Sequence, residues 1–264
     1  TFSIELSKKS FIDIWNSGMI DVHPVLYYWL LHIINFFSKL FNNPQITIVM
    51  ARIFSSLATI ILGVVGYTHV KKDFGDKAGI IFSFFLFFMP VQIIYSQEIR
   101  MYTWLLLFVT MSSIYAQRLI KNGNSNKNII LFTLFNVAAS YTHYYGLMTN
   151  VLINLVIILW LIKTNRKMIK KIIVSILCQI VIYIPWIPNF INQTKMVSDD
   201  FWVKFIFPKT ILETFEFQFT GNNIGDWNYI TPMVGIVFGI IIVTYSIFKN
   251  LKKKDNTLLN LFTI

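Results

Sequence analysis

Apolar residues follow one another along this chain in long blocks that short polar segments interrupt. The hydrocarbon core of a bilayer is about 30 Å thick, and a helix needs about 20 residues to cross it. Only helices and closed barrels satisfy their backbone hydrogen bonds in lipid, and these blocks lack the period-two alternation of barrel strands. The pattern therefore predicts an all-α, polytopic transmembrane helical bundle, with apolar blocks near 25–41, 46–70, 78–95, 101–119, 129–147, 148–163, 171–190 and 229–248.

Polar or small residues interrupt this pattern at two informative places. Only Gly146 and Asn150 mark the junction between the blocks at 129–147 and 148–163, which favours a tight helical hairpin over one very long helix. Asn35 and Ser38 interrupt the block at 25–41. A full crossing there would put the amphiphilic run before it on the cytoplasmic side, although that run is typical of an external loop. We therefore predict that this block does not cross the bilayer completely.

Basic residues give the expected orientation, because cytoplasmic loops are rich in Lys and Arg. The strongest basic cluster lies at 163–171, and Lys249 and Lys252 to Lys254 form the next, so both are expected inside. Counting blocks back from 163 assigns the other polar segments alternately to the two sides: His143 outside, 118–127 inside, Glu98 and Arg100 outside, and 71–73 inside.

The ends of the sequence suggest a piece of a longer chain. Thr1 is not an initiator Met, no signal-peptide pattern opens the sequence, and residues 258–264 resemble the start of another apolar segment. We expect an internal fragment of a multi-pass plasma-membrane protein. Its expected parts are 1–24 as part of an external loop, 25–190 as the transmembrane core, 191–228 as an external loop, and 229–264 as a further transmembrane helix and the start of the next.

Composition narrows the class of protein. Hydrophobic residues make up 55% and charged residues only 13%, against about 25% charged in soluble domains. The excess of 23 Lys and Arg over 12 Asp and Glu sits at the ends of apolar blocks, which indicates topology rather than nucleic-acid binding. Cys178 is the single cysteine, so neither a disulfide within the chain nor a thiolate metal site is expected. Nucleotide-binding glycine loops and metal-ligand spacings are absent from the sequence.

The break from Ser96 to Tyr102 is the most informative polar segment. Glu98 and Arg100 lie between two apolar blocks, where ionisable residues are expensive to bury and usually functional. Alternatively, both residues lie at a helix end and extend to water at the interface. On an irregular loop, Arg100 would clamp a phosphate. Glu98 would orient Arg100 or accept a hydrogen bond from a hydroxyl-rich ligand.

Two further segments carry candidate chemistry. In the run from Asp21 to Tyr28, Asp21 and Pro24 are explained equally well by helix capping, whereas His23 is suited to phosphate binding or proton transfer. In the run from Tyr141 to Gly146, the tyrosines fit an interfacial belt, whereas His143 is unusual there. The candidate substrate-binding residues are therefore Asp21, His23, Glu98, Arg100, Tyr102, His143 and Tyr144.

These three segments, in this order, resemble motifs of the bacterial branch of the protein mannosyltransferase-like glycosyltransferases (family 39), whose relatives include the lipid A aminoarabinose transferases. The resemblance covers roughly residues 1–165 and departs at Val25, where the family has a second Pro. It implies a GT-C fold. It also implies transfer of a hexosyl or pentosyl sugar from a polyprenyl-phosphate donor to a protein, lipid or glycan acceptor at the outer face of the membrane.

The family pattern also places an acidic Asp-Glu pair, the source of the catalytic base, in the first external loop. That pair is expected just before Thr1, so the catalytic residue remains unassigned, its role is not transferred to Glu5 or Asp13, and the fragment is expected to be inactive. A divalent cation is compatible with the chemistry but not required by it, and no other cofactor is implied.

Two other classes of protein stay open. A transporter or flippase for a lipid-linked or small polar substrate commonly has two related halves, but the 190–228 segment has no counterpart in the first half. A purely structural subunit of the cell envelope would leave Glu98 and Arg100 without a purpose.

Overall fold

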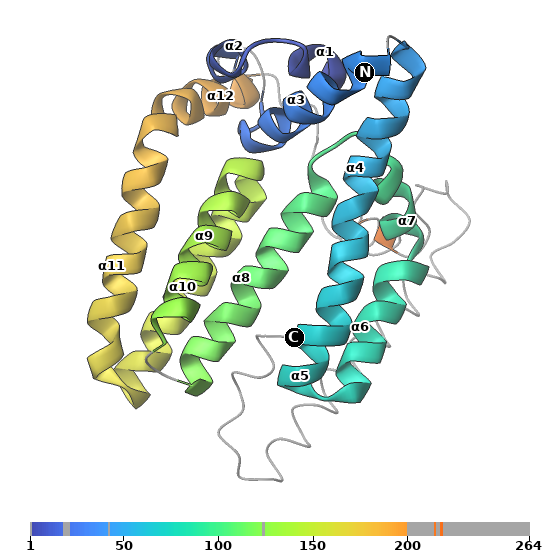
Figure 1. Ribbon diagram of the computed structural model, residues 1–264. Helices are drawn as coiled ribbons and strands as arrows, with labels where there is room; N and C mark the ends of the chain where they lie inside the picture. The colour runs from blue at the N-terminus through green and yellow to red at the C-terminus, as the bar shows by residue number, and fades with distance from the viewer. Residues whose placement is uncertain are drawn as a thin grey trace. The chain divides into compact units, whose positions relative to one another are not determined.

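The computed structural model describes residues 2–17, 22–41, 43–122 and 125–199, together with 214, 217 and 218. These residues are helical almost throughout and contain no strand, as the sequence predicts (Figure 1). Residues 1–86 and 95–201 form one compact unit, and residues 87–94 and 202–264 form a second. Every candidate site residue that the structure describes belongs to the first unit. Asp21, residues 200–213 and the expected helix at 229–248 lie outside the described residues.

The helices have these bounds: α1 (Phe2–Ser7), α2 (Phe11–Asn16), α3 (Leu26–Ser38), η2 (Lys39–Phe41), α4 (Pro44–Val65), the π-helix η3 (Gly66–Val70), α5 (Lys71–Phe74), α6 (Asp76–Phe88), α7 (Pro90–Gln97), α8 (Tyr102–Asn122), α9 (Asn126–Thr142), α10 (Tyr144–Thr164), α11 (Arg166–Tyr183), η4 (Ile184–Trp186) and α12 (Ile187–Asp199).

In the part of the chain that the structure describes, four helices are long and apolar enough to cross a membrane: Pro44–Phe74, Tyr102–Lys121, Tyr144–Thr164 and Arg166–Val197. The bent pair α6 and α7 would make a fifth span. Only 22% of the most apolar window of Tyr144–Thr164 is buried, so most of this hydrocarbon surface faces outward. Exposed apolar surface on this scale is stable in lipid and not in water, which indicates a membrane protein.

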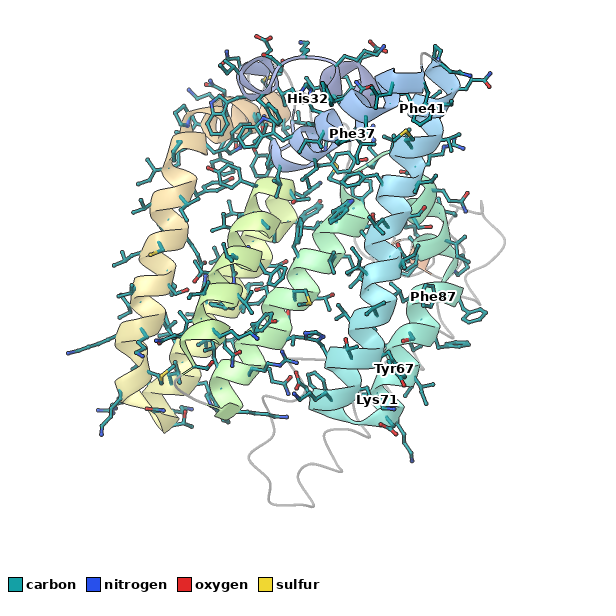
Figure 2. All side chains as sticks on the ribbon, in the orientation of Figure 1. His32, Phe37, Phe41, Tyr67, Lys71 and Phe87 are labelled. Carbon is teal, nitrogen blue, oxygen red and sulfur yellow. The ribbon has the colours of Figure 1, made fainter. Side chains whose placement is uncertain are left out.

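The block at 25–41 does not form a span, as predicted. Its helix α3 has 13 residues and lies with α1, α2 and α12 at one end of the bundle (Figure 1). Phe36, Phe37 and Phe41 are all exposed, and Figure 2 labels the last two on this end. A short helix that exposes aromatic side chains at the end of a bundle is suited to the membrane interface.

The predicted hairpin is confirmed, but its boundary was wrong. The break falls at His143, whose backbone is extended (φ −160°, ψ 149°), and not at 147–148. The His143 side chain accepts a hydrogen bond from the Tyr145 backbone N–H at 3.1 Å and so caps α10. Gly146 lies inside α10 instead, where a Cβ would collide with the carbonyl oxygen of Ala139 on α9. Glycine at this position therefore permits close packing of α9 and α10.

The described basic segments that were predicted to share one side, near 71–73, 118–122 and 166–171, gather at one end, whereas Lys249 and Lys252 to Lys254 lie outside the described residues. Arg118 Nε lies 2.7 Å from Asp73 Oδ2 in a half-buried ion pair, and Lys171 Nζ donates to Asn126 Oδ1 at 3.1 Å. Figure 2 labels Lys71 at this end and His32 at the opposite one. The assignment of the basic end to the cytoplasm remains a prediction.

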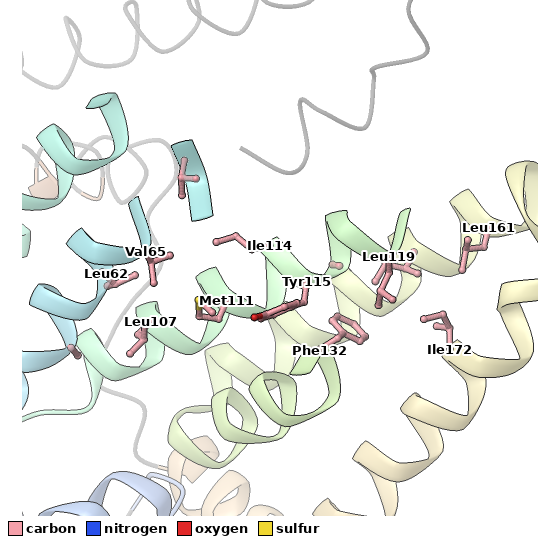
Figure 3. Close-up of a cluster of buried hydrophobic side chains, with 14 of the residues drawn as sticks. Leu62, Val65, Leu107, Met111, Ile114, Tyr115, Leu119, Phe132, Leu161 and Ile172 are labelled. Carbon is pink, nitrogen blue, oxygen red and sulfur yellow. The ribbon is translucent and has the colours of Figure 1, made fainter. Parts of the chain in front are cut away.

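Two apolar clusters hold the first unit together. The larger one joins α4, α8, α9, α10 and α11 through side chains such as Leu62, Leu119, Phe132, Leu161 and Ile172 (Figure 3). The smaller one lies where α1, α2 and α3 meet the bundle. It includes Ile14, Tyr27, Tyr28, Leu31, Met101 and Trp186. This smaller cluster contains or contacts several residues of the candidate site.

Candidate functional site

The polar break from Ser96 to Tyr102 is an irregular segment fastened to α4. Helix α7 ends at Gln97, residues 98–101 are bends, and α8 starts at Tyr102. Three hydrogen bonds from both sides fix it: Ser56 Oγ donates to the Ser96 carbonyl at 2.8 Å, Thr103 Oγ1 to the Ser55 carbonyl at 2.9 Å, and Trp104 Nε1 to the Phe54 carbonyl at 3.2 Å. The shape of the break is therefore set by α4.

Burial alternates along the break. Ile99 and Met101 are buried in the smaller apolar cluster, whereas Glu98 is exposed and Arg100 is half-buried. Residues 98–101 are irregular, and Glu98 is exposed directly after the end of α7, so the geometry fits both interpretations of the break: a loop that lines a cavity, and charged residues at a helix end that extend to water. Within the described part of the chain, Glu98 and Arg100 make no ion pair with each other, so nothing here supports Glu98 as the residue that orients Arg100.

Arg100 acts electrostatically on Tyr27. The Tyr27 side chain is fully buried, and its hydroxyl lies 3.1 Å from Ser55 Oγ. Burial raises the pKa of Tyr27 to about 12, while the Ser55 hydrogen bond and the Arg100 charge act in the opposite direction. Tyr27 therefore stays protonated near neutral pH. Its neutral hydroxyl pairs with Ser55 on α4, the helix to which the break is hydrogen-bonded.

Three aromatic rings from distant parts of the sequence meet beside the break. The centroid of the His143 ring lies 5.3 Å from that of His23 and 6.0 Å from that of Tyr102. His23 comes from the segment before α3, Tyr102 from the first turn of α8, and His143 from the α9–α10 junction. The structure thus brings together one residue from each of the three motifs.

His143 is held as a neutral imidazole. Burial, and then the nearby charge of His23, lower its pKa to about 4. Its Nδ1 accepts the Tyr145 N–H, so the proton of the neutral ring belongs on Nε2. His143 is therefore a hydrogen-bond donor through Nε2 near neutral pH, not a cation.

Tyr144 contributes indirectly, through residues that the sequence did not single out. Its hydroxyl donates to Gln193 Oε1 and accepts from Trp186 Nε1 at 3.3 Å, and Gln193 Nε2 donates to the His23 carbonyl at 3.4 Å. Gln193 and Trp186 are buried. Gln193 was missed because residues from 191 onward were expected to form an external loop, whereas α12 continues to Asp199. Pro185 and Pro188 were the signal that the chain turns back over the bundle here.

An apolar groove lies close to these residues. Its volume is about 370 Å³, and Trp15 and Trp29 stack at its wall with ring centroids 5.7 Å apart. Leu26 lines it three residues after His23, and Tyr141 lines it two residues before His143. Leu134, Val137, Ala138 and Ile182 complete its lining. Apolar space therefore adjoins the polar residues of the site.

The described residues contain no group of three His, Cys, Asp or Glu side chains placed to hold a metal ion. No protein-family model, no curated protein and no solved structure matches this chain. A function has to be argued from the geometry of the site and from the motifs.

Proposed function

We propose that this chain forms part of a membrane glycosyltransferase that moves a sugar from a polyprenyl-phosphate donor to an acceptor at the outer face of the membrane. The observation that carries the proposal is the meeting of His23, Tyr102 and His143 at one end of an apolar helical bundle, with Arg100 two residues before Tyr102 in the same break. These residues come from the three motifs that suggested the family, and no local feature of the sequence requires them to meet.

The chemistry of the donor explains the residue types. When the acceptor attacks the anomeric carbon, the bond from that carbon to the phosphate oxygen breaks and the lipid phosphate leaves with the electron pair. Half-buried Arg100 would neutralise that phosphate, and the Nε2–H of neutral His143 would donate to one of its oxygens or to a sugar hydroxyl. A carboxylate must accept the acceptor's proton. We assign that base to none of the described residues.

The groove lined by Trp15, Trp29 and Tyr141 suits the other part of the donor. A prenyl chain needs apolar space that begins next to the phosphate site and opens toward lipid. Leu26 and Tyr141 connect the groove in sequence to His23 and His143, respectively. In this proposal the groove receives the first isoprene units while the phosphate lies at Arg100.

A transfer assay tests the proposal and separates it from transport. Because the catalytic base is expected outside this chain, the full-length protein is reconstituted into liposomes with polyprenyl-phosphate donors that carry labelled sugars. Both the labelled product and the label moved across the bilayer are measured. We expect Arg100→Ala to lower transfer about 100-fold or more, as loss of a phosphate-stabilising donor does at such sites. Arg52→Ala, an exposed arginine on α4, is the control and should retain transfer. Label that crosses the bilayer without any covalent product would favour the transporter instead.

A further inference from the structure

A second groove lies between the first turns of α9 and α11. Both helices begin at the basic end of the bundle, opposite α1, α2 and α3 (Figure 1). The volume of the groove is about 430 Å³, within the range of about 300–1,000 Å³ that is usual for small-molecule sites. Six residues line it: Asn126, Ile129, Ile130, Lys170, Lys171 and Val174.

The lining is polar at one end and apolar at the other. Asn126 is the first residue of α9, and Lys170 and Lys171 lie in the second turn of α11, so both helices bring their polar residues to the basic end. Ile129, Ile130 and Val174 follow about one turn further along. Lys171 Nζ donates to Asn126 Oδ1 at 3.1 Å, which joins the two helices at the polar end.

Charge at this groove is strongly one-sided. Helix α11 carries Arg166, Lys167, Lys170 and Lys171 in its first two turns and has no Asp or Glu among its 18 residues. Positive side chains near a helix N-terminus oppose the helix dipole, and like charges so close together repel. An anion between Lys170 and Lys171 would relieve both effects.

The apolar residues of the groove indicate which kind of anion it would bind. Ile130 is 57% exposed and Val174 59% exposed, on helices whose outward faces are apolar along most of their length. A free phosphate would use only the lysines and leave this wall uncovered. An anionic phospholipid would use both parts, because its phosphate suits the lysines and its acyl chain suits the apolar residues.

We infer that this groove binds one anionic phospholipid, with the phosphate held by Lys170, Lys171 and the Asn126 amide and an acyl chain packed on Ile129, Ile130 and Val174. The site is at the opposite end of the bundle from His143 and is independent of the proposed glycosyl transfer. If the basic end is cytoplasmic, the ligand comes from the inner leaflet, where anionic lipids attract juxtamembrane basic residues.

Lipid retention measured by native mass spectrometry tests the inference. The purified protein in a neutral detergent is titrated with phosphatidylglycerol or with phosphatidylcholine. We expect one phosphatidylglycerol to bind in preference to phosphatidylcholine, and the double variant Lys170→Gln, Lys171→Gln to weaken its binding about 30-fold. The matched control, Lys72→Gln with Lys77→Gln, removes the same charge from exposed positions at the same end and should change binding less than twofold.

A second pair of measurements separates a lipid from a free anion. Val174→Trp fills the groove at an exposed position that the fold tolerates, and it should weaken phosphatidylglycerol while leaving both lysines in place. Inorganic phosphate at millimolar concentration should not displace the lipid. The inference would be overturned if the two double variants weakened binding equally, or if phosphatidylcholine bound as well as phosphatidylglycerol. It would also be overturned if phosphate displaced the lipid fully and Val174→Trp bound the lipid normally.

Discussion

At the residue scale, the His143 side chain caps α10 and, in the proposed function, also donates a hydrogen bond to the substrate. The two roles use different ring atoms: Nδ1 accepts the Tyr145 N–H, and Nε2 carries the proton. The lowered pKa has other causes, which are burial and then the nearby charge of His23. His143 therefore ties the local structure of the junction to the chemistry of the site.

This arrangement predicts a pH-dependent stability. The pKa of His143 is about 4 in the folded protein and ordinarily about 6.5, so between these values the unfolded chain binds more protons than the folded one. The contribution is fully present above pH 6.5 and is lost as the pH falls from 6.5 toward 4. His143→Asn keeps an N-cap but does not titrate, so its melting temperature should fall less over this range than that of the unmodified protein.

His143→Ala provides the comparison for that experiment. It removes the cap as well and should cost about 1 kcal/mol at every pH, while showing the same flattened pH profile as His143→Asn. An unchanged pH profile in both variants, measured by thermal unfolding in detergent, would mean that His143 is not buried as a neutral ring.

At the residue scale, the sequence predicted that Arg100 and His143 share one side of the membrane, but it did not show which side chains meet there. His23, Tyr102 and His143 were chosen because each interrupts or flanks an apolar block, which is a local property. Their meeting depends on how α3, α8 and α10 pack, and Gln193 entered the site only through the unexpected α12. The capping role of His143 was also missed, because the hairpin boundary had been placed beyond it.

Close helix packing governs the element scale, and Gly146 is its clearest case. A Cβ at this position would meet the backbone oxygen of Ala139, which belongs to the neighbouring helix and cannot rotate away. At Gly66, a Cβ would instead meet Ser83 Oγ at 2.7 Å and the Phe82 ring at 2.8 Å, both of which are side-chain atoms able to move.

We therefore expect Gly146→Ala to be more destabilising than Gly66→Ala. Overpacking typically costs about 1–3 kcal/mol, and the cost should be near the upper end for Gly146 because the obstacle is backbone. Unfolding titrations with a denaturing detergent measure the difference between the two variants. A smaller effect at Gly146 than at Gly66 would contradict the close α9–α10 contact.

At this scale the sequence predicted which blocks are helical better than where the helices end. The short α3 was recognised from Asn35 and Ser38, and both are indeed buried and hydrogen-bonded there, with Ser38 Oγ donating to the Asn35 carbonyl at 2.8 Å. By contrast, α11 continues through Pro185 and Pro188 into α12, which hydropathy alone assigned to a loop. Helix α12 buries Asn189 and Gln193 but leaves most of its other described residues exposed, so this largely polar helix has no hydropathy signal of its own.

At the scale of the whole molecule, the two ends of the bundle differ in charge and in chemistry. The half-buried Arg118–Asp73 pair and the Lys171–Asn126 bond belong to the basic end, whereas His23, Arg100 and His143 belong to the other. The rule that cytoplasmic loops are basic places the basic end inside and the candidate site outside.

Cysteine labelling tests this orientation directly. Cys178 is the single native cysteine, so Cys178→Ala gives a background without thiols. In intact cells, a membrane-impermeant maleimide should label Glu98→Cys, which is exposed, and should label Lys167→Cys only after permeabilisation. The reverse pattern would place the candidate site on the cytoplasmic side and contradict transfer at the outer face.

The central claim is that the residues around Arg100 bind a polyprenyl phosphate, whatever sugar the donor carries. Binding of sugar-free polyprenyl phosphate, measured by the shift in melting temperature of the purified protein, tests it most directly. We predict a clear stabilisation that Arg100→Ala abolishes and Arg52→Ala retains. Equal stabilisation of both variants, or none in the unmodified protein, would contradict the account.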